Sequence, residues 1–194
     1  MSNAEVIQIF KDRGALLQGH FQLSSGLHSA IYLQCAIALQ QTTDTQRFGA
    51  ELASHFRDRE IATVASPAIG GIVIGYEVAR QLGCRFIWTE RVDGQMTLRR
   101  GFAVSAGVRI LVIEDVVTTG GSTRDTIDAL TKSGAHVVAA AAIIDRSAGR
   151  SEVGVPLISL AQLDVPAVAA DACEACKQGQ PVIKPGSRAG SSAS

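Results

Sequence analysis

The chain has 194 residues, of which 46% are hydrophobic and 19% charged, and its formal net charge is zero. This length and apolar content predict one globular domain with a well-filled core. The balanced charge argues against a broad nucleic-acid-binding surface. The longest apolar run, 137–144, is far shorter than the ~20 residues of a membrane span. No signal peptide is recognisable in the first ten residues, so we expect a cytoplasmic protein that binds neither nucleic acid nor membranes.

Hydrophobic periodicity predicts helices at 5–13, 43–57, 72–82 and 122–132. It predicts strands at 61–65, 84–89, 110–113, 137–144 and 155–160, and two extended pieces within 19–33 around a turn at 24–26. Thr43 or Asp44 is expected to cap the second helix. From residue 61 onward strands and helices alternate, which predicts an α/β fold with a parallel sheet and helices on both faces.

Three polar or glycine-rich segments follow strands of this sheet, at 66–71, 114–122 and 145–146. Ligands of such sheets bind beyond the carboxyl ends of the strands, so we expect the three segments to converge on one site. The polar segment 90–102 is expected to be an exposed hairpin or a mobile loop. Its arginines, Arg91, Arg99 and Arg100, form either a solvated face or a lid that closes over a polyanionic ligand.

The strongest functional signal is the segment 109–123, in which an apolar strand ends in Glu114 and Asp115. Carboxylates accept hydrogen bonds from the vicinal hydroxyls of a ribose. The following loop of hydroxyl and glycine residues leads into a helix, whose backbone N–H groups favour a phosphate. The order predicts a ribose 5-phosphate site, although a solvated turn and an ordinary capped helix start are the alternatives. The loop has no lysine, which excludes a P-loop.

Other candidates have structural alternatives of similar weight. The glycines at 70 and 71 either bind a second anion such as diphosphate or serve only the turn. Arg146 either recognises a planar carboxylate bidentately or pairs with Asp145. Tyr32 and His28 either belong to the core or line a base pocket.

Two of the four cysteines, Cys173 and Cys176, form a CxxC pair. A structural zinc site needs further ligands at matching spacing, and neither His55 nor His136 offers it. We therefore expect the pair to lie in an ordinary turn with small, half-buried side chains.

The segment 110–123 resembles the phosphoribosyl diphosphate (PRPP) signature of type I phosphoribosyltransferases: an apolar strand, two acidic residues, two apolar residues and Thr-Thr-Gly-Gly-Ser. Within that superfamily, 19–29 (GHFQLSSGLHS), 96–102 (MTLRRGF) and 173–188 are similar to short-loop bacterial orotate phosphoribosyltransferases. The resemblance extends from Phe10 to Arg188. It implies a single domain over 1–186, with a core at 43–160 and a small hood made by about 1–40 and the C-terminal segment. The polar tail 187–194 is expected to be disordered.

The resemblance implies transfer of the phosphoribosyl group from PRPP to orotate, giving orotidine 5′-monophosphate and diphosphate with Mg²⁺. Glu114 and Asp115 would hold the ribose hydroxyls, and Gly70 would lie in the diphosphate loop. The 5′-phosphate would bind Val116, Val117, Thr118, Thr119, Gly120, Gly121 and Ser122. Orotate would contact Thr118 and Arg146, in a pocket shaped by Ser25, Tyr32 and Leu33. Mg²⁺ would bind through PRPP and water, with no direct protein ligand.

The resemblance also implies a homodimer in which the mobile loop serves the neighbouring subunit's site. Many family members carry lysine where this chain has Ser24, and a lysine and histidine in the loop, which here has neither. We therefore expect Arg91 and Asp115 to be the catalytic residues, with Arg99 and Arg100 as alternatives to Arg91 for the loop cation. Two other functions remain open: a purine or uracil phosphoribosyltransferase, and a non-catalytic regulator of the same fold that binds PRPP or nucleotide.

Overall fold

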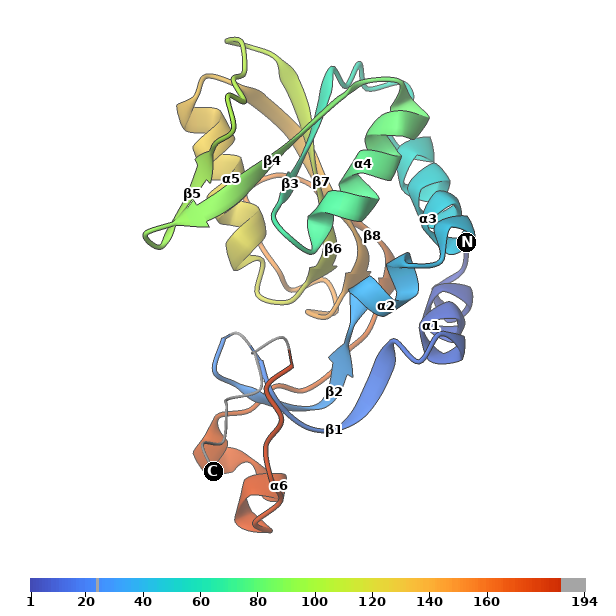
Figure 1. The fold of residues 1–194 in the computed structure, drawn as a ribbon, viewed down its shortest axis with the longest axis vertical. Coiled ribbons are helices and arrows are strands. Elements are labelled where there is room, and N and C mark those ends of the chain that lie inside the picture. The colour runs from blue at the N-terminus through green and yellow to red at the C-terminus, as the bar shows by residue number, and fades with distance from the viewer. Residues whose placement is uncertain (24, 186–194) are drawn as a thin grey trace, which may run out of the picture. The chain divides into compact units, whose positions relative to one another are not determined.

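The computed structural model describes residues 1–23 and 25–185; Ser24 and the tail from 186, including the expected disordered segment 187–194, lie outside the described residues. The chain divides into two compact units (Figure 1). The larger unit contains 1–15 and 35–164, and the smaller contains 16–34 and the C-terminal segment from Val165. The first 15 residues, which we grouped with the hood, thus belong to the larger unit.

The larger unit is built on a six-stranded sheet of order β5-β4-β3-β6-β7-β8. The strands are β3 (Thr63–Pro67), β4 (Arg85–Val92), β5 (Gln95–Leu98), β6 (Arg109–Val117), β7 (His136–Asp145) and β8 (Leu157–Gln162). All neighbouring pairs are parallel except β4 and β5, which form an antiparallel hairpin at one edge. The predicted parallel sheet is confirmed.

Helices cover both faces of this sheet, as predicted (Figure 1). They are α1 (Asn3–Asp12), α2 (Cys35–Leu39), α3 (Thr42–Ser54), α4 (Gly71–Leu82) and α5 (Gly121–Lys132). Helix α4 joins β3 to β4 and α5 joins β6 to β7, so the crossovers run in opposite directions from the sheet's centre. Because such crossovers are right-handed, the two helices lie on opposite faces.

Alternation along the central strand β6 supplies both layers of the core. Ile110 and Val112 pack with Ile127 and Leu130 of α5. Leu111 and the other residues of opposite parity point to the face on which α4 packs, since successive strand residues alternate faces. This double burial explains why β6 is apolar without interruption up to its acidic pair.

Among the predicted helices, the one expected at 43–57 differs most from its counterpart in the structure, α3. Neither Thr43 nor Asp44 caps α3: the N-cap residue is Gln41, which makes no side-chain capping bond in the described chain. Asp44 is buried and instead accepts a 2.7 Å hydrogen bond from Arg13 Nε. The helix ends at Ser54, three residues earlier than expected, and α2 was not predicted.

The segment 90–102 begins as a hairpin, one of the two alternatives. Its two-residue loop is Asp93-Gly94, with φ of 48° and 81°. Positive φ at both positions is the requirement of a type I′ turn, which Asp-Gly satisfies well.

The smaller unit contains the antiparallel strands β1 (Leu16–Gln22) and β2 (His28–Leu33). The C-terminal segment carries two short elements that the sequence did not predict, the 3₁₀ turn η1 (Ala170–Ala172) and α6 (Glu174–Lys177). Backbone bridges join His28 to Val168 and Phe21 to Ile183, so this segment lies beside both strands. Among the described residues, no helix combines the length and apolarity needed to cross a bilayer.

Candidate active site

The acidic pair lies near the end of the central strand β6 rather than after it, because β6 continues to Val117. Glu114 is buried and Asp115 is half-buried. Asp115 Oδ1 accepts a 2.8 Å hydrogen bond from the Val116 N–H, and Glu114 Oε1 accepts a 3.2 Å bond from the Asp115 N–H. Burial, reinforced by the neighbouring charge of Asp115, raises the pKa of Glu114 well above its ordinary value of 4.5.

The loop between β3 and α4 lies directly against this pair. A Cβ added at Gly70 would stand 2.8 and 2.9 Å from the two carboxylate oxygens of Asp115. A Cβ at Gly71 would stand 2.9 Å from the carbonyl oxygen of Ile113 and 3.1 Å from Glu114 Oε1. Only glycine permits this approach at both positions, so two of the three predicted segments meet here.

Cys35, at the start of α2, also lies beside Asp115. The thiol is 3% exposed, and burial together with the adjacent Asp115 charge and hydrogen bond raises the pKa of Cys35 well above its ordinary value. The thiol is therefore protonated at neutral pH and hydrogen-bonded to the carboxylate. Sequence reasoning missed Cys35, because a single cysteine with no spaced partner carries no signal.

The start of α5 presents open backbone donors. Gly120 precedes the helix with a φ of 73°, and no side chain of the described residues caps it. The first N–H groups of a helix have no intrahelical acceptor, so an uncapped start attracts an anion. The hydroxyl-bearing Thr118, Thr119 and Ser122 are exposed around it.

The loop that follows β7 contacts the turn between β6 and α5. Ser151 Oγ donates a 2.9 Å hydrogen bond to the Thr118 carbonyl, and Arg124 Nη1 donates a 2.6 Å bond to the Glu152 carbonyl. A Cβ at Gly120 would stand 2.8 Å from Val153 Cγ1. Glycine is therefore required at 120 both for its φ and for the close packing.

The third predicted segment ends β7 beside the acidic pair's strand. Asp145 is buried, and its carboxylate accepts bonds from the Ser147 N–H (2.7 Å), Ser147 Oγ (2.6 Å) and Gly149 N–H (2.9 Å). Arg146 is also buried, and its N–H donates to the Val117 carbonyl at 2.8 Å. The positive charge of Arg146 partly opposes the rise in the pKa of Cys35.

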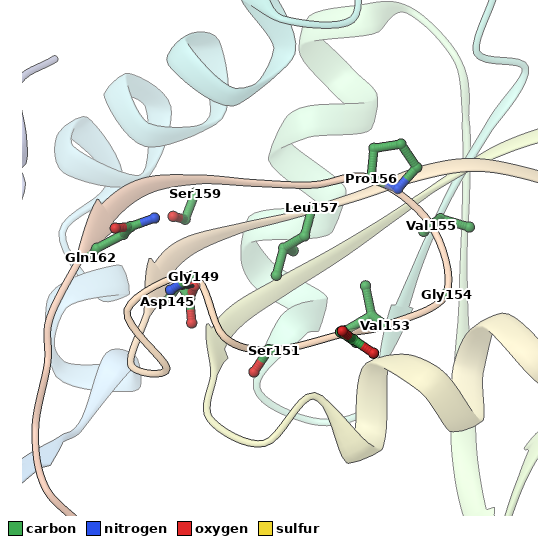
Figure 2. A pocket seen from close by; sticks show the side chains of 11 residues that line it. Asp145, Gly149, Ser151, Val153, Gly154, Val155, Pro156, Leu157, Ser159 and Gln162 are labelled. Carbon is green, nitrogen blue, oxygen red and sulfur yellow. Dashed lines mark hydrogen bonds between the residues drawn. The ribbon is translucent and has the colours of Figure 1, made fainter.

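A hollow of about 600 Å³ lies beside the turn that follows β7 (Figure 2). Ser151 and Val153 of the loop border it on one side, and Leu157 and Ser159 of β8 on the other. Its lining includes neither the acidic pair nor the start of α5. It is therefore distinct from the carboxylate cradle.

The three candidate loop arginines are exposed and paired with carboxylates. Arg91 Nη2 lies 2.6 Å from Asp125 Oδ2 of α5, and Nη1 donates to the Gly94 carbonyl at 2.6 Å. Arg99 and Arg100 both pair with Glu90. Hydrogen bonds from Arg100 and Trp88 lower the pKa of Glu90. Each arginine must exchange a carboxylate partner before it can bind an anionic ligand.

Comparison with known proteins decides the family. Residues 41–165 match the model of the phosphoribosyl transferase domain. The chain is 48% identical to the orotate phosphoribosyltransferase of Caldicellulosiruptor bescii, covering 97% of this chain and 99% of that protein. It is also 48% identical to the enzyme of Heliobacterium modesticaldum, covering 97% and 100%. The chain belongs to the orotate phosphoribosyltransferase family. The resemblance of the 110–123 segment is thereby confirmed.

A solved member of the family has the same fold. The orotate phosphoribosyltransferase of Aeropyrum pernix superimposes with a TM-score of 0.66 at 27% identity, covering 81% of this chain and 93% of that one. The type I fold predicted from the sequence is confirmed.

The residues predicted to shape the orotate pocket lie in the smaller unit. Ser25 is exposed in the turn between β1 and β2, and Leu33 is buried at the end of β2. Tyr32 is half-buried and stacks on Phe21, with ring centroids 5.7 Å apart. Their contact with a base stays a prediction.

Proposed function

We propose that this chain transfers the 5-phosphoribosyl group of PRPP to orotate, producing orotidine 5′-monophosphate and diphosphate for pyrimidine synthesis. The observation that carries the proposal is the cradle at the end of β6. There Glu114 and Asp115 lie under the Gly70 loop, beside the uncapped start of α5. The names of the similar proteins support the same reaction.

In this proposal the cradle binds the sugar phosphate at both ends. Asp115 and Glu114 accept hydrogen bonds from the ribose hydroxyls. The 5′-phosphate binds the backbone donors of the turn that runs from Val116 and Val117 through Gly120 and Gly121, with the hydroxyls of Thr118, Thr119 and Ser122.

The diphosphate of PRPP binds along the Gly70 loop, where the missing side chain leaves the backbone open. Mg²⁺ binds through the oxygens of PRPP and through water, as this hard cation prefers, with no direct protein ligand. When bound, Mg²⁺ neutralises charge on the departing diphosphate. Arg91, once it leaves its ion pair with Asp125, also stabilises the negative charge that develops on the departing diphosphate.

Arg146 recognises the orotate carboxylate, and Thr118 contacts the base. A guanidinium offers two parallel donors that match a carboxylate, whereas purines and uracil carry no such group. Ser25, Tyr32 and Leu33 are the smaller unit's candidates for contact with the base. Orotate is already an anion, so the chain needs no strong general base, and its task is to orient the base against the anomeric carbon and exclude water.

The proposal includes a homodimer in the cytoplasm. Ile69, in the turn before α4, is 85% exposed, and Val73 and Tyr76 of α4 are 49% and 60% exposed. Large apolar side chains gathered on one face favour association with another protein surface. The phosphorylated substrates do not cross membranes, so the enzyme works in the compartment that makes them.

The test follows the fall in orotate absorbance with purified protein, PRPP and Mg²⁺, using adenine, hypoxanthine and uracil as competing bases. We expect turnover only with orotate. Arg146→Gln should raise the KM for orotate and leave that for PRPP nearly unchanged, while Asp115→Asn should impair use of PRPP. Turnover with a purine or uracil alone would replace orotate as the substrate, and tight nucleotide binding without any turnover would favour a regulator.

A further inference from the structure

Four metal-binding side chains converge within the smaller unit. They are His20 of β1, His28 of β2, Cys173 just before α6 and Cys176 within α6. One ligand atom from each lies within 4.8 Å of the other three. His20, His28 and Cys173 are 6%, 5% and 7% exposed, whereas Cys176 is partly exposed.

Hydrogen bonding between neutral side chains does not account for this cluster. His20 Nδ1 lies 3.0 Å from the Gln180 carbonyl oxygen. Only a protonated nitrogen bonds to a carbonyl, so in neutral His20 the Nε2 atom carries a lone pair. That lone pair faces His28 Nδ1 at 2.8 Å and both sulfurs at 3.5 Å. One lone pair accepts one hydrogen, whereas three groups approach it.

A cation at the centre would satisfy all four atoms together. Zinc forms tetrahedral bonds of about 2.0–2.1 Å to nitrogen and 2.3 Å to sulfur, which separates neighbouring ligand atoms by roughly 3.3–3.8 Å. The two sulfurs lie 3.5 Å from His20 Nε2, within this range. His28 Nδ1 lies closer, at 3.2 Å from Cys176 Sγ and 2.8 Å from His20 Nε2, so its ring must move outward by roughly half an ångström to bind the same ion. We propose that His20, His28, Cys173 and Cys176 bind a structural zinc ion.

The local structure around the four residues suits this ligand set. The two cysteines are three positions apart on a tight turn, in which the Lys177 N–H bonds to the Cys173 carbonyl at 3.1 Å. The β1–β2 register shifts between Gln18 and Phe21, and an irregularity of this kind re-aims the side chain of His20. The bond from His20 Nδ1–H to Gln180 fixes the ring tautomer, as outer-shell acceptors do for zinc-bound histidines.

The smaller unit also has a physical need for such a link. It contains one two-stranded sheet, which is marginally stable alone, and short segments from distant parts of the chain. Its buried apolar side chains are few: Phe21, Leu23, Leu33 and Val165, besides Cys173. A metal bound by both segments supplies the stability that a small core lacks. Four protein ligands leave no open position, so the zinc is structural rather than catalytic.

The sequence contained half of this site. The CxxC pair is visible in the sequence, but neither His55 nor His136 is its partner. His55 ends α3 and His136 begins β7, both in the larger unit. His20 and His28 lie more than a hundred residues before the cysteines, and the bridges from β1 and β2 to the C-terminal segment bring them together.

The test measures metal on the full-length protein, purified without a histidine tag and reconstituted with zinc sulfate under reducing conditions. Elemental analysis should find one zinc per chain. Replacement of zinc by Co²⁺ should give the visible absorption bands of a tetrahedral site with sulfur-to-metal charge transfer. Cys176→Ser and His28→Gln should lose this metal, whereas the matched controls Cys84→Ser and His136→Gln should retain it.

Substoichiometric zinc after reconstitution, or equal zinc in the ligand and control variants, would overturn the proposal. So would a Cys173–Cys176 disulfide in the native protein, detected by mass before and after reduction. The cobalt spectrum of the unmutated chain needs no variant, so it decides the matter even where a variant fails to fold. None of these readouts uses orotate or PRPP, and the zinc site stands or falls independently of the proposed reaction.

Discussion

Two adjacent glycines should separate the activity of this protein from its stability. Gly70→Ala and Gly71→Ala each add one methyl group at the Asp115 and Glu114 cradle, but against different neighbours. At Gly70 the new Cβ meets only the two oxygens of a half-buried carboxylate, at 2.8 and 2.9 Å. At Gly71 it meets the Ile113 backbone carbonyl at 2.9 Å.

The expected magnitudes follow from those neighbours. An ordinary carbon–oxygen contact is about 3.3–3.6 Å, so Asp115 must retreat by roughly 0.5 Å in Gly70→Ala. Gly70 has helical φ and ψ of −55° and −45°, where alanine gains about 0.4–1 kcal/mol over glycine. This gain offsets the displacement, and stability should change little. Gly71→Ala presses on rigid backbone, and such overpacking costs about 1–3 kcal/mol.

In the orotate assay, Gly70→Ala should lower kcat/KM by about 10–100-fold, because displacements approaching 1 Å in a reacting site cost up to about 10²-fold. That loss is about 1.4–2.7 kcal/mol of transition-state stabilisation. Gly71→Ala should lower the Tm by roughly 2–12 °C, at about 2–4 °C per kcal/mol for a chain of this size. Full activity in Gly70→Ala with Asp115 unmoved, or equal Tm values for both variants, would refute this account of the cradle.

Three further predictions concern the loop, the surface and the buried acid. Arg91→Ala should lower kcat by about 10²–10³-fold, the cost of losing a donor to developing charge. Asp125→Ala removes the half-exposed ion pair with Arg91, and it should leave kcat undiminished and change stability by less than about 1 kcal/mol. A fall in kcat like that of Arg91→Ala would show that the Arg91–Asp125 ion pair itself is needed. Tyr76→Glu should convert the dimer to a monomer in light scattering, and an unchanged mass would remove α4 from the interface. Glu114→Gln should raise the Tm above pH 4.5. In the unfolded chain the Glu114 carboxyl ionises above this pH, whereas in the folded chain its raised pKa keeps it protonated, so the native protein loses stability as the pH rises from 4.5 towards the folded pKa. A Tm difference that does not change with pH would contradict this.

Local patterns were sufficient to predict the sheet and the cradle. The apolar run at 110–113 must be covered on both faces, and the glycine-hydroxyl loop that follows Asp115 has few structures other than a helix start. Both features depend on residues close together in the chain. The convergence of 66–71, 114–122 and 145–146 then followed from topology, because parallel strands end at one edge. The close approach of the Gly70 backbone to the Asp115 carboxylate confirms the first part of that convergence.

Features that depend on tertiary neighbours were not predictable. Asp44 is a residue type that commonly caps helices, but its carboxylate binds Arg13 instead. Helix α3 therefore begins without a capping bond from Asp44. Cys35 becomes a neighbour of Asp115 only through the packing of α2. The cluster of His20 and His28 with the cysteines joins two ends of the chain, and no spacing rule connects them.

Two features of the proposed active site cost stability in the free chain. Helix α1, far from it in sequence, has a complete capping box between Ser2 and Glu5. Helix α5 begins without a side-chain cap, at a Gly120 held in the left-handed region. Glu114 is buried where its ionised form is disfavoured. Each feature costs stability in the free chain, and a bound phosphate at α5 with hydroxyls on the carboxylates would satisfy both together. The same ligand should therefore raise the Tm of the parent chain more than that of Glu114→Gln, since the parent has more to recover on binding.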